Sequence, residues 1–375
     1  MTKLDRMTTE AERFFSEKGL ATVAVPILQP ADPFLDMAGE DLRRNIFMTE
    51  NENGDSLCLR PEFTIPVCMT HIANGTHTPH RYAYIGEVFR QRREGGNSFF
   101  QAGIEDLGDS NEAEADARTL YDALELIARI APSDDDIIVL GDQAVFAAIL
   151  AELGIAHGWQ KKLLRAFGNQ EQLRNLLQAL SAPKREQILP DELKILVQAQ
   201  DEQALINYLE EEMLSGDMSP SSGRTPAEIA KRLLEKQQLS SARLIPSVLQ
   251  ALEEFLSIQI TLDKAEQQLA DFGRKHHLPI DHFLALFEAR NSALVERGVK
   301  LSDIRYDAAF GRPLDYYTGL VYEVRRDNRF IVGGGRYDRL MTMLGAKKSI
   351  PAVGFSIWLD RLTDDIAAGR GEALK

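Results

Sequence analysis

The stretch YIGEVFRQRREGGNSFFQAGIEDLG, residues 84–108, predicts a β-hairpin: a strand, an arginine-rich turn with paired glycines (95–96), and a second strand. Side chains two residues apart share one face of a strand, so Gln101 and Glu105 point the same way with only Gly103 between them. The glycine would leave room for a ligand. A buried Glu105 would be costly unless a cation or a hydrogen-bond donor meets it. The alternative is a solvated hairpin without a binding role.

The beginning and end of the chain are predicted to form one domain that helices interrupt. Residues 1–145 contain strand-like runs such as AYIGEVF (83–89) and turns such as Asn53-Gly54-Asp55, and strand-like runs return in residues 305–375. Residues 146–304 have a nearly continuous helical pattern. No regular alternation of strands and helices is present to build a parallel sheet. We therefore expect an α+β fold with an antiparallel sheet flanked by helices.

Local patterns predict individual elements. Thr225, Pro226 and Glu228 are typical of a helix start, after a break at residues 215–223. The runs 320–326 and 329–335 predict strands, and a closing helix is expected at residues 357–366. Five apolar residues recur at helical spacing and are expected to pack one face of a helix into the core: Ala113, Ala117, Leu120, Leu124 and Ile127.

The composition excludes several classes of protein. The chain has 43 Lys and Arg against 57 Asp and Glu, a net charge of -14, so its average surface repels phosphate backbones and nucleic acid is not the expected main partner. No run approaches the roughly 18 apolar residues of a membrane span, and the N-terminus lacks a signal-peptide pattern. We expect a cytoplasmic protein without membrane contact.

Metal and cofactor motifs are missing. Cys58 and Cys68 lack zinc spacing and are expected to be free core thiols, and the loop that holds His71, His77 and His80 does not guarantee a shared geometry. The sequence contains no GxSxG, HExxH or GxxxxGK[ST] motif and no GxGxxG followed by a suitably spaced acid. We expect no metal, no cofactor and no catalytic residues.

Two further clusters have ligand-binding chemistry. In LRPEFT (59–64), a proline-stiffened turn holds Glu62 and Thr64 two residues apart, and such a pair can enclose an ammonium group. In GRPLDYYTGLVYEV (311–324), Arg312 offers a planar fork for a carboxylate and Tyr317 offers a phenol. The glycines at 333–335 would let backbone approach a ligand closely, although by themselves they could be a bulge.

As an ordered set, these motifs resemble the class II aminoacyl-tRNA synthetases, and specifically histidyl-tRNA synthetase. LRPE-x-T, FR with a later Q-x-G-x-E, R-x-LDYYT, GGGRYD and VGF-x(5)-R follow one another. The resemblance implies that Glu62, Thr64 and Gln101 take the ammonium group of histidine, that Glu105 and Tyr317 take its imidazole, and that Arg312 takes its carboxylate. The expected histidine-binding residues are Glu62, Thr64, Arg90, Gln101, Glu105, Arg312, Tyr316 and Tyr317.

Four departures from the synthetase pattern concern the nucleotide half of the site. Arg92 stands where the family has a glutamate that accepts from the adenine amine, and arginine offers no acceptor. Trp358 replaces a glycine in the floor of the adenine pocket. Asp360 replaces the family's glutamate before the closing arginine, which is a smaller change. The loop between Arg90 and Gln101 is shorter than in the synthetases. The sequence ends 14 residues after Arg361, too few for an anticodon-binding domain, which we therefore expect to be absent.

A retained amino-acid half with an altered nucleotide half is similar to the regulatory subunits of short-form ATP phosphoribosyltransferase. The resemblance implies activation of the first step of histidine biosynthesis and feedback by L-histidine. It also implies a homodimer that joins the catalytic subunit in a hetero-oligomer, expected to be a hetero-octamer. Two alternatives remain: a truncated histidyl-tRNA synthetase paralogue that activates or transfers an amino acid, using Arg90 and Arg361 to grip phosphates, and a histidine-binding scaffold.

Overall fold

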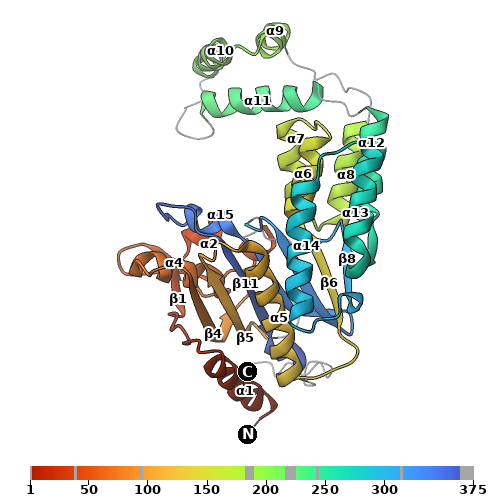
Figure 1. Ribbon diagram of the computed structural model, residues 1–375. Coiled ribbons are helices and arrows are strands. Elements are labelled where there is room, and N and C mark those ends of the chain that lie inside the picture. Colours follow the sequence, from red (N-terminus) through yellow and green to blue (C-terminus); the bar gives the residue numbers. More distant parts are fainter. Residues whose placement is uncertain are drawn as a thin grey trace. The chain divides into compact units, whose positions relative to one another are not determined.

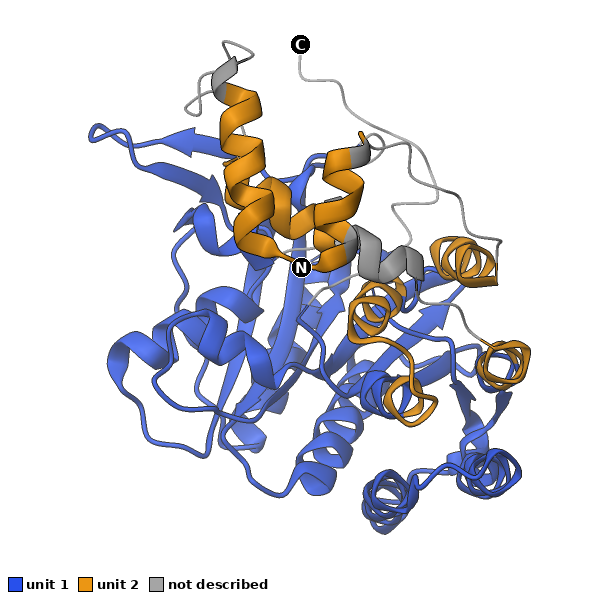
Figure 2. Ribbon diagram, turned by 90° about the horizontal axis from the view of Figure 1, so that it is seen from above, with its two compact units in different colours: residues 1–148, 167–169, 254–375 blue, residues 149–166, 170–253 orange. Residues whose placement is uncertain are grey.

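The computed structural model (Figure 1) describes residues 2–37, 40–92, 96–181, 190–215, 225–241, 245–312 and 316–363. The chain groups into two compact units (Figure 2), one of residues 1–148, 167–169 and 254–375 and one of residues 149–166 and 170–253. Residues 254–304, which the sequence pattern assigns to the helical insertion, group with the strands of the first unit.

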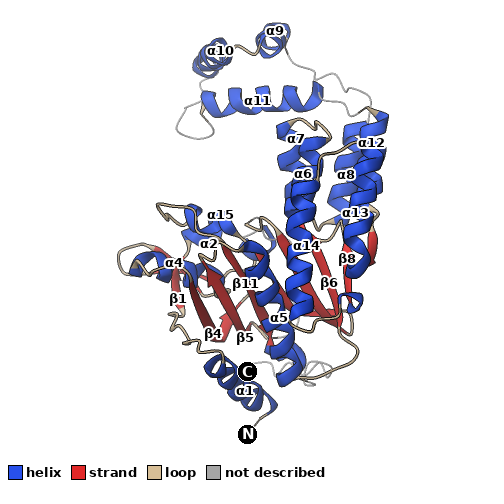
Figure 3. Cartoon of the chain, in the orientation of Figure 1, coloured by secondary structure: helices blue, strands red, loops and turns tan. Residues whose placement is uncertain are grey.

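The first unit is built on a mixed sheet of eight described strands (Figure 3). Their order across the sheet is β4 (His80–Phe89), β5 (Ser98–Leu107), β11 (Ala352–Trp358), β10 (Arg329–Arg336), β9 (Leu320–Arg326), β6 (Ile137–Asp142), β8 (Ile304–Asp307) and β7 (Gln259–Thr261). Neighbouring strands pair antiparallel, as expected, except that β6 and β8 pair parallel. Parallel pairing needs a long crossover, and helical sequence between β6 and β8 supplies it.

The predicted hairpin is confirmed as β4 and β5, with Tyr84 opposite Gly103. Its turn residues 93–95 lie outside the described residues. The expected space beside Gly103 is not open, because the hydroxyl of Tyr84 and the carbonyl of Phe355 lie where a side chain at Gly103 would be. Glycine is therefore required at 103 by packing between strands, and the prediction of ligand space there is wrong.

One face of the sheet is covered by α5 (Glu112–Ile130), with α14 (Asp281–Glu296) beside it (Figure 1). The side chain of Asn111 accepts from the backbone N–H of Glu114 and begins α5 in the usual way for a cap. Tyr322 of β9 donates its hydroxyl to the Thr119 carbonyl at 3.3 Å, which joins the helix to this face. The predicted apolar face of α5 is buried apart from Leu124, which is half-buried.

Buried ion pairs hold these helices to the sheet. Arg336 of β10 donates to Asp116 of α5 at 2.7 Å, and Arg290 of α14 donates to Asp142 of β6 at 2.9 Å. Burial raises the pKa of Asp116 to about 6, against the opposing effect of the two arginines. Arg336 is the arginine of the GGGRYD motif. In the structure it holds α5 against the sheet through Asp116.

The opposite face of the sheet is covered by a small sheet and short helices. The pieces are β1 (Leu28–Pro30), β2 (Met48–Glu50), β3 (Ser56–Leu59), α2 (Asp32–Met37), α3 (Glu40–Arg43), α4 (Thr64–Asn74) and α15 (Asp338–Met343). The turn predicted at residues 53–55 joins β2 to β3, where Gly54 adopts a φ of 81°. Cys58 and Cys68 are buried free thiols in this part of the core, as expected.

The predicted closing helix is wrong at its start. Residues 357–358 belong to β11, and a short 3-10 helix follows at Leu359–Leu362. The remainder of the predicted helix, from residue 364, lies outside the described residues. The strand forms because β11 pairs with both β5 and β10, a tertiary pairing that local helical spacing does not reveal.

The remaining helices are α1 (Lys3–Glu17), α6 (Gln143–Glu152), α7 (His157–Ala166), α8 (Gln170–Ser181), α9 (Asp191–Ala199), α10 (Glu202–Ser215), α11 (Pro226–Ser241), α12 (Pro246–Leu256), α13 (Leu262–His276) and the 3-10 turn Leu301–Asp303. The predicted cap of α11 is confirmed, since Thr225 and Glu228 exchange backbone-to-side-chain hydrogen bonds of 2.9 and 3.3 Å. The break predicted just before it, from residue 216, lies outside the described residues. No described helix is long and apolar enough to cross a membrane.

Candidate functional site

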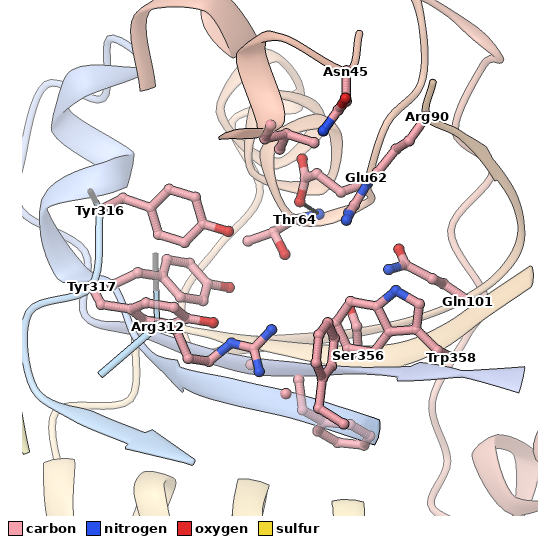
Figure 4. Close-up of a pocket in the computed structure, with 16 residues that line it drawn as sticks. Asn45, Glu62, Thr64, Arg90, Gln101, Arg312, Tyr316, Tyr317, Ser356 and Trp358 are labelled. Carbon is pink, nitrogen blue, oxygen red and sulfur yellow. Dashed lines mark hydrogen bonds between the residues drawn. The ribbon is translucent and has the colours of Figure 1, made fainter. Parts of the chain in front are cut away.

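A cavity of about 180 Å³ opens on the sheet face opposite α5 (Figure 4). It is lined by Leu42, Asn45, Glu62, Thr64, Arg90, Gln101, Arg312, Tyr316, Tyr317, Phe330, Gly333, Tyr337, Gly354, Phe355, Ser356 and Trp358. Seven of the eight residues predicted to bind a ligand therefore meet at one cavity, although they come from segments far apart in the sequence. The eighth, Glu105, does not line it.

Strand periodicity explains why the sheet contributes these side chains. Trp358 of β11 lies directly opposite Gln101 of β5, and Ser356 lies opposite both Gly103 and Gly333. Residues two apart in a strand share a face, so 354, 356 and 358 all point to the cavity side. The expected common face of Gln101 and Glu105 belongs to the same side of the sheet.

Three lining residues carry acceptor oxygens, and we call this part of the cavity the acceptor end: Glu62, Thr64 and Gln101. The Glu62 carboxylate accepts from the backbone N–H groups of Thr64 and Ile65, at 2.7 and 2.9 Å, at the start of α4. Burial raises the pKa of Glu62, while these hydrogen bonds and nearby Arg90 act in the opposite direction. Among the described residues, Gln101 Oε1 is buried without a hydrogen-bond partner.

Glu105 lies behind the acceptor end. Its carboxylate accepts a 2.7 Å hydrogen bond from the Thr64 hydroxyl and another from the Tyr337 hydroxyl. The carboxylate is completely buried, and burial raises its pKa to about 8. A buried Glu105 was expected to need a cation or a hydrogen-bond donor, and these two hydroxyls are the donors. They also use the carboxylate's acceptors, so the structure places Glu105 against Thr64 and Tyr337, and its predicted contact with imidazole stays a prediction.

Two arginines line the cavity. Arg90 donates its Nε–H to the Pro61 carbonyl at 2.8 Å, and burial lowers its pKa to about 10. Arg312 places a terminal nitrogen 3.2 Å from the Glu323 carboxylate, and its guanidinium lies 5.0 Å from the centre of the Phe330 ring. The charge of Arg312 is thus partly balanced within the protein.

The three consecutive glycines have packing roles. A side chain at Gly333 would collide with the Arg312 guanidinium, and one at Gly334 would collide with Tyr322. Gly335 is closed in by the Leu320 carbonyl and the Tyr317 ring. Gly333 lines the cavity. The sequence predicts that the glycines let a ligand approach the backbone, but in the structure the protein's own side chains approach them closely.

At the side of the cavity formed by Phe330 and Trp358, aromatic rings and guanidinium groups stack in what we call the stacked wall: Arg92, Phe99, Phe330, Trp358 and Arg361. Arg92 lies 3.8 Å from the centre of the Phe99 ring, and Arg361 lies 3.9 Å from that of Phe330. Phe330 and Trp358 meet edge to face at 4.9 Å. Cation–π contacts of this kind stabilise by about 0.5–2 kcal/mol each.

Polar contacts hold the arginines around the wall in place. Asp360 lies 3.7 Å from Arg92, and the Arg361 guanidinium donates to the Phe330 carbonyl at 2.5 Å. Burial lowers the pKa of Arg361 to about 10. Arg90 is held by the Pro61 carbonyl.

The histidines do not form a metal centre in the described part of the chain. The ring of His71 hydrogen-bonds the Tyr82 hydroxyl at 3.0 Å and lies 6.5 Å from the ring of His80. Among described residues, no three His, Cys, Asp or Glu side chains are grouped to hold a metal ion.

Comparison with known proteins adds a family to this geometry. A family model described as histidyl-tRNA synthetase matches residues 1–223 and 221–362. A Brucella anthropi protein named ATP phosphoribosyltransferase regulatory subunit is 57% identical over 344 residues, which are 91% of this chain and 92% of that protein. The chain belongs to the family of ATP phosphoribosyltransferase regulatory subunits. A Brucella ovis protein of the same name is 56% identical over the same lengths, and the family resemblance predicted from the motifs is confirmed.

Solved structures show the fold shared by this regulatory-subunit family. One is described as an ATP phosphoribosyltransferase regulatory subunit/histidyl-tRNA synthetase from Bacillus halodurans; its TM-score is 0.63 at 18% identity, covering 98% of this chain and 79% of that one. A histidine–tRNA ligase subunit from Alicyclobacillus acidocaldarius has a TM-score of 0.58 at 23% identity, covering 96% and 91%. The predicted class II synthetase-like fold is confirmed.

Several lining residues of this family member were missed by the motif analysis. Tyr337 lies two residues after the glycine run, within the GGGRYD motif, so its aromatic ring could have been noticed. Ser356 and Phe330 lie in strands whose facing depends on register. Asn45 comes from a segment with no motif, and no local pattern would have revealed it.

Proposed function

We propose that this chain is a non-catalytic regulatory subunit that joins a separate short-form ATP phosphoribosyltransferase catalytic subunit and binds free L-histidine in the cavity. The observation that carries the proposal is the contrast inside one site. Glu62, Thr64 and Gln101 line the cavity, and the oxygen of Gln101 is unpaired among the described residues, whereas Arg92 and Arg361 of the stacked wall already lie on aromatic rings of the same chain. The family supports the regulatory role.

The cavity suits an amino acid in size and chemistry. Its volume of about 180 Å³ is below the roughly 300–1,000 Å³ of pockets that hold drug-sized molecules. An ammonium group offers three N–H donors, which can meet Glu62, Thr64 and Gln101. A carboxylate can meet Arg90 or Arg312 through charge-assisted hydrogen bonds.

The imidazole of histidine would then lie toward Tyr316 and Tyr317, which approach each other with ring centres 5.2 Å apart. Both phenols are buried, and burial raises the pKa of Tyr317 to about 12, so it stays a neutral donor and acceptor at physiological pH. Glu105 would act as a positioning residue here, because it holds the hydroxyls of Thr64 and Tyr337 that border the cavity.

We propose that ATP is excluded. Arg92 lies on Phe99 and beside Asp360, and it offers no acceptor to an adenine amine, whose loss costs about 1–3 kcal/mol. Trp358 fills the wall where the synthetase pattern has glycine. Arg90 and Arg361, which supported the enzyme alternative, donate to backbone carbonyls. An amino-acid-activating activity is therefore the less favoured function.

Regulation would follow from preferential binding of histidine to one state of the assembly, with a coupling free energy of about 1–3 kcal/mol. We propose a homodimer within a hetero-octamer that works in the cytoplasm and activates the first step of histidine biosynthesis. The acidic net charge supports a protein partner over nucleic acid.

The direct experiment mixes the full chain with a short-form catalytic subunit. We expect the two to copurify, phosphoribosyl transfer to rise, and L-histidine to lower it. An unchanged rate would contradict the regulatory proposal. Histidine-dependent exchange of pyrophosphate into ATP is measured on the chain alone, and measurable turnover there would contradict the non-catalytic part.

A further inference from the structure

Two buried polar atoms on neighbouring strands lack partners in the described part of the chain. They are the carboxamide oxygen of Gln101 and the indole nitrogen of Trp358. The two residues are 1% and 5% exposed, lie directly opposite each other in the register of β5 and β11, and line the same cavity. One atom only accepts and the other only donates. Leaving either atom unpaired in the protein interior is costly.

A molecule that carries both a hydrogen-bond donor and an acceptor can pair both atoms at once. Side chains directly opposite in an antiparallel sheet have Cβ atoms about 4.5–5.5 Å apart, so the ligand must carry a donor and an acceptor close together. An α-amino acid does so, because its ammonium and carboxylate groups are attached to the same carbon. In Figure 4 the indole nitrogen lies on the ring edge that faces Gln101, at the same end of the cavity as Glu62 and Arg90.

We propose that the indole N–H of Trp358 donates to the carboxylate of the bound amino acid, so that Trp358 selects ligands with a free carboxylate. This inference rests on the proposed function, since it concerns the histidine cavity. Trp358 is thus both part of the stacked wall and a binding residue. The single change from glycine to tryptophan, relative to the synthetase pattern, provides both roles.

The neighbouring cations are less selective than a single N–H. The Arg90 Nε–H is used by the Pro61 carbonyl, and Arg312 lies 3.2 Å from the Glu323 carboxylate, while its Nε and Nη1 have no hydrogen-bond partner among the described residues. Both guanidinium groups would also bind other anions. The indole offers one N–H whose direction is set by edge-to-face packing on Phe330 at 4.9 Å. A carboxylate oxygen close to the ammonium group can accept this hydrogen bond.

The first test compares two ligands on the full chain by isothermal titration calorimetry: L-histidine, and L-histidinol, in which a hydroxymethyl group replaces the carboxylate. Trp358→Phe keeps a ring in the wall and removes the N–H. We expect this variant to bind histidine about 10-fold or more weakly and histidinol only about 3-fold more weakly, because hydrogen bonds to charged acceptors are the stronger ones.

The outcomes separate the two proposals. Equal losses for both ligands would mean that Trp358 only shapes the cavity, and unchanged histidine binding would mean that the indole donates nothing; either result overturns the inference and leaves the histidine site in place. A wild-type chain that binds neither ligand would instead contradict the proposed function itself.

A second measurement needs no variant to fold well. The chain contains two tryptophans, Trp159 and Trp358, so the indole region of a ¹H–¹⁵N spectrum holds two signals. We expect histidine to move the Trp358 signal and slow its hydrogen exchange, with a smaller effect from histidinol, while the Trp159 signal, from α7, stays in place as an internal control. A Trp358 signal indifferent to saturating histidine overturns the inference.

Discussion

The acceptor end and the stacked wall lie in one site and differ in what their side chains still need. At the acceptor end, Glu62 and Gln101 line the cavity, and the oxygen of Gln101 has no partner among the described residues. In the stacked wall, Arg92 and Arg361 already lie on aromatic rings. The acceptor end keeps an unpaired oxygen, whereas the arginines of the stacked wall already contact other side chains of the chain.

This difference arises from side chains, because the backbone frame is common to both regions. Gln101 and Trp358 are opposite each other on adjacent strands of one sheet. A class II synthetase-like scaffold can therefore keep an amino-acid site while losing a nucleotide site through a few substitutions. Each prediction below changes one side of that contrast.

The largest effect is expected for Glu62→Gln. Removing the only carboxylate among the described lining residues leaves the ligand's ammonium group without its counter-charge, and such truncations cost about 2–5 kcal/mol. Histidine affinity should fall at least 30-fold in calorimetry. Glu87→Gln on β4, outside the cavity lining, is the matched control and should bind like wild type. Equal affinities for both variants would remove the charge argument for the acceptor end.

Gln101→Leu should have the next largest effect. The substitution keeps the approximate size of the side chain and removes the unpaired acceptor, so histidine should bind about 10-fold more weakly. Imidazole propionate, which lacks the ammonium group, should bind wild type and variant equally. A parallel loss for both ligands would show that the substitution disturbs the cavity in general.

Glu105 connects the acceptor end to folding stability. Because burial raises its pKa to about 8, the folded chain holds a proton there that the unfolded chain releases near its ordinary pKa of 4.5. This stabilisation is fully present below pH 4.5 and is lost as the pH rises through about 8, with a slope of at most ~1.4 kcal/mol per pH unit. Urea unfolding of wild type and Glu105→Gln from pH 5 to 9 measures the difference, and parallel curves would argue against a protonated Glu105.

The smallest effect is expected for Arg92→Gln, on the stacked-wall side. Its guanidinium lies on Phe99 and 3.7 Å from Asp360, and an exposed contact of this kind contributes about 0.5–1 kcal/mol. Thermal stability should fall slightly, and histidine affinity should stay within about 2-fold of wild type. A large loss of histidine binding would mean that the two regions are not separable.

Much of the fold and site followed from residue order alone. Strand-like runs and the glycine-containing turn predicted the hairpin and the strands within residues 320–335. Motifs with ligand-binding chemistry predicted which segments would meet, and seven of the eight chosen residues line one cavity. Their roles toward histidine remain the proposal to be tested.

Other features were decided only by tertiary structure. Local spacing could not show that residues 357–358 extend a strand, that β6 and β8 pair parallel, or that Asn45 borders the cavity. The sequence suggested open space beside Gly103 and Gly333. In the structure, Tyr84 and Arg312 occupy that space.

The physical reason is that a sequence pattern determines which way a side chain points, whereas the occupant of the space in front of it comes from elsewhere in the chain. Tyr84 meets the Phe355 carbonyl across 271 residues, and the Tyr337 hydroxyl reaches Glu105 across 232. The amino acid sequence by itself determined the chemistry available to this site; packing between distant strands decided which of those groups the protein uses itself and which it leaves for a ligand.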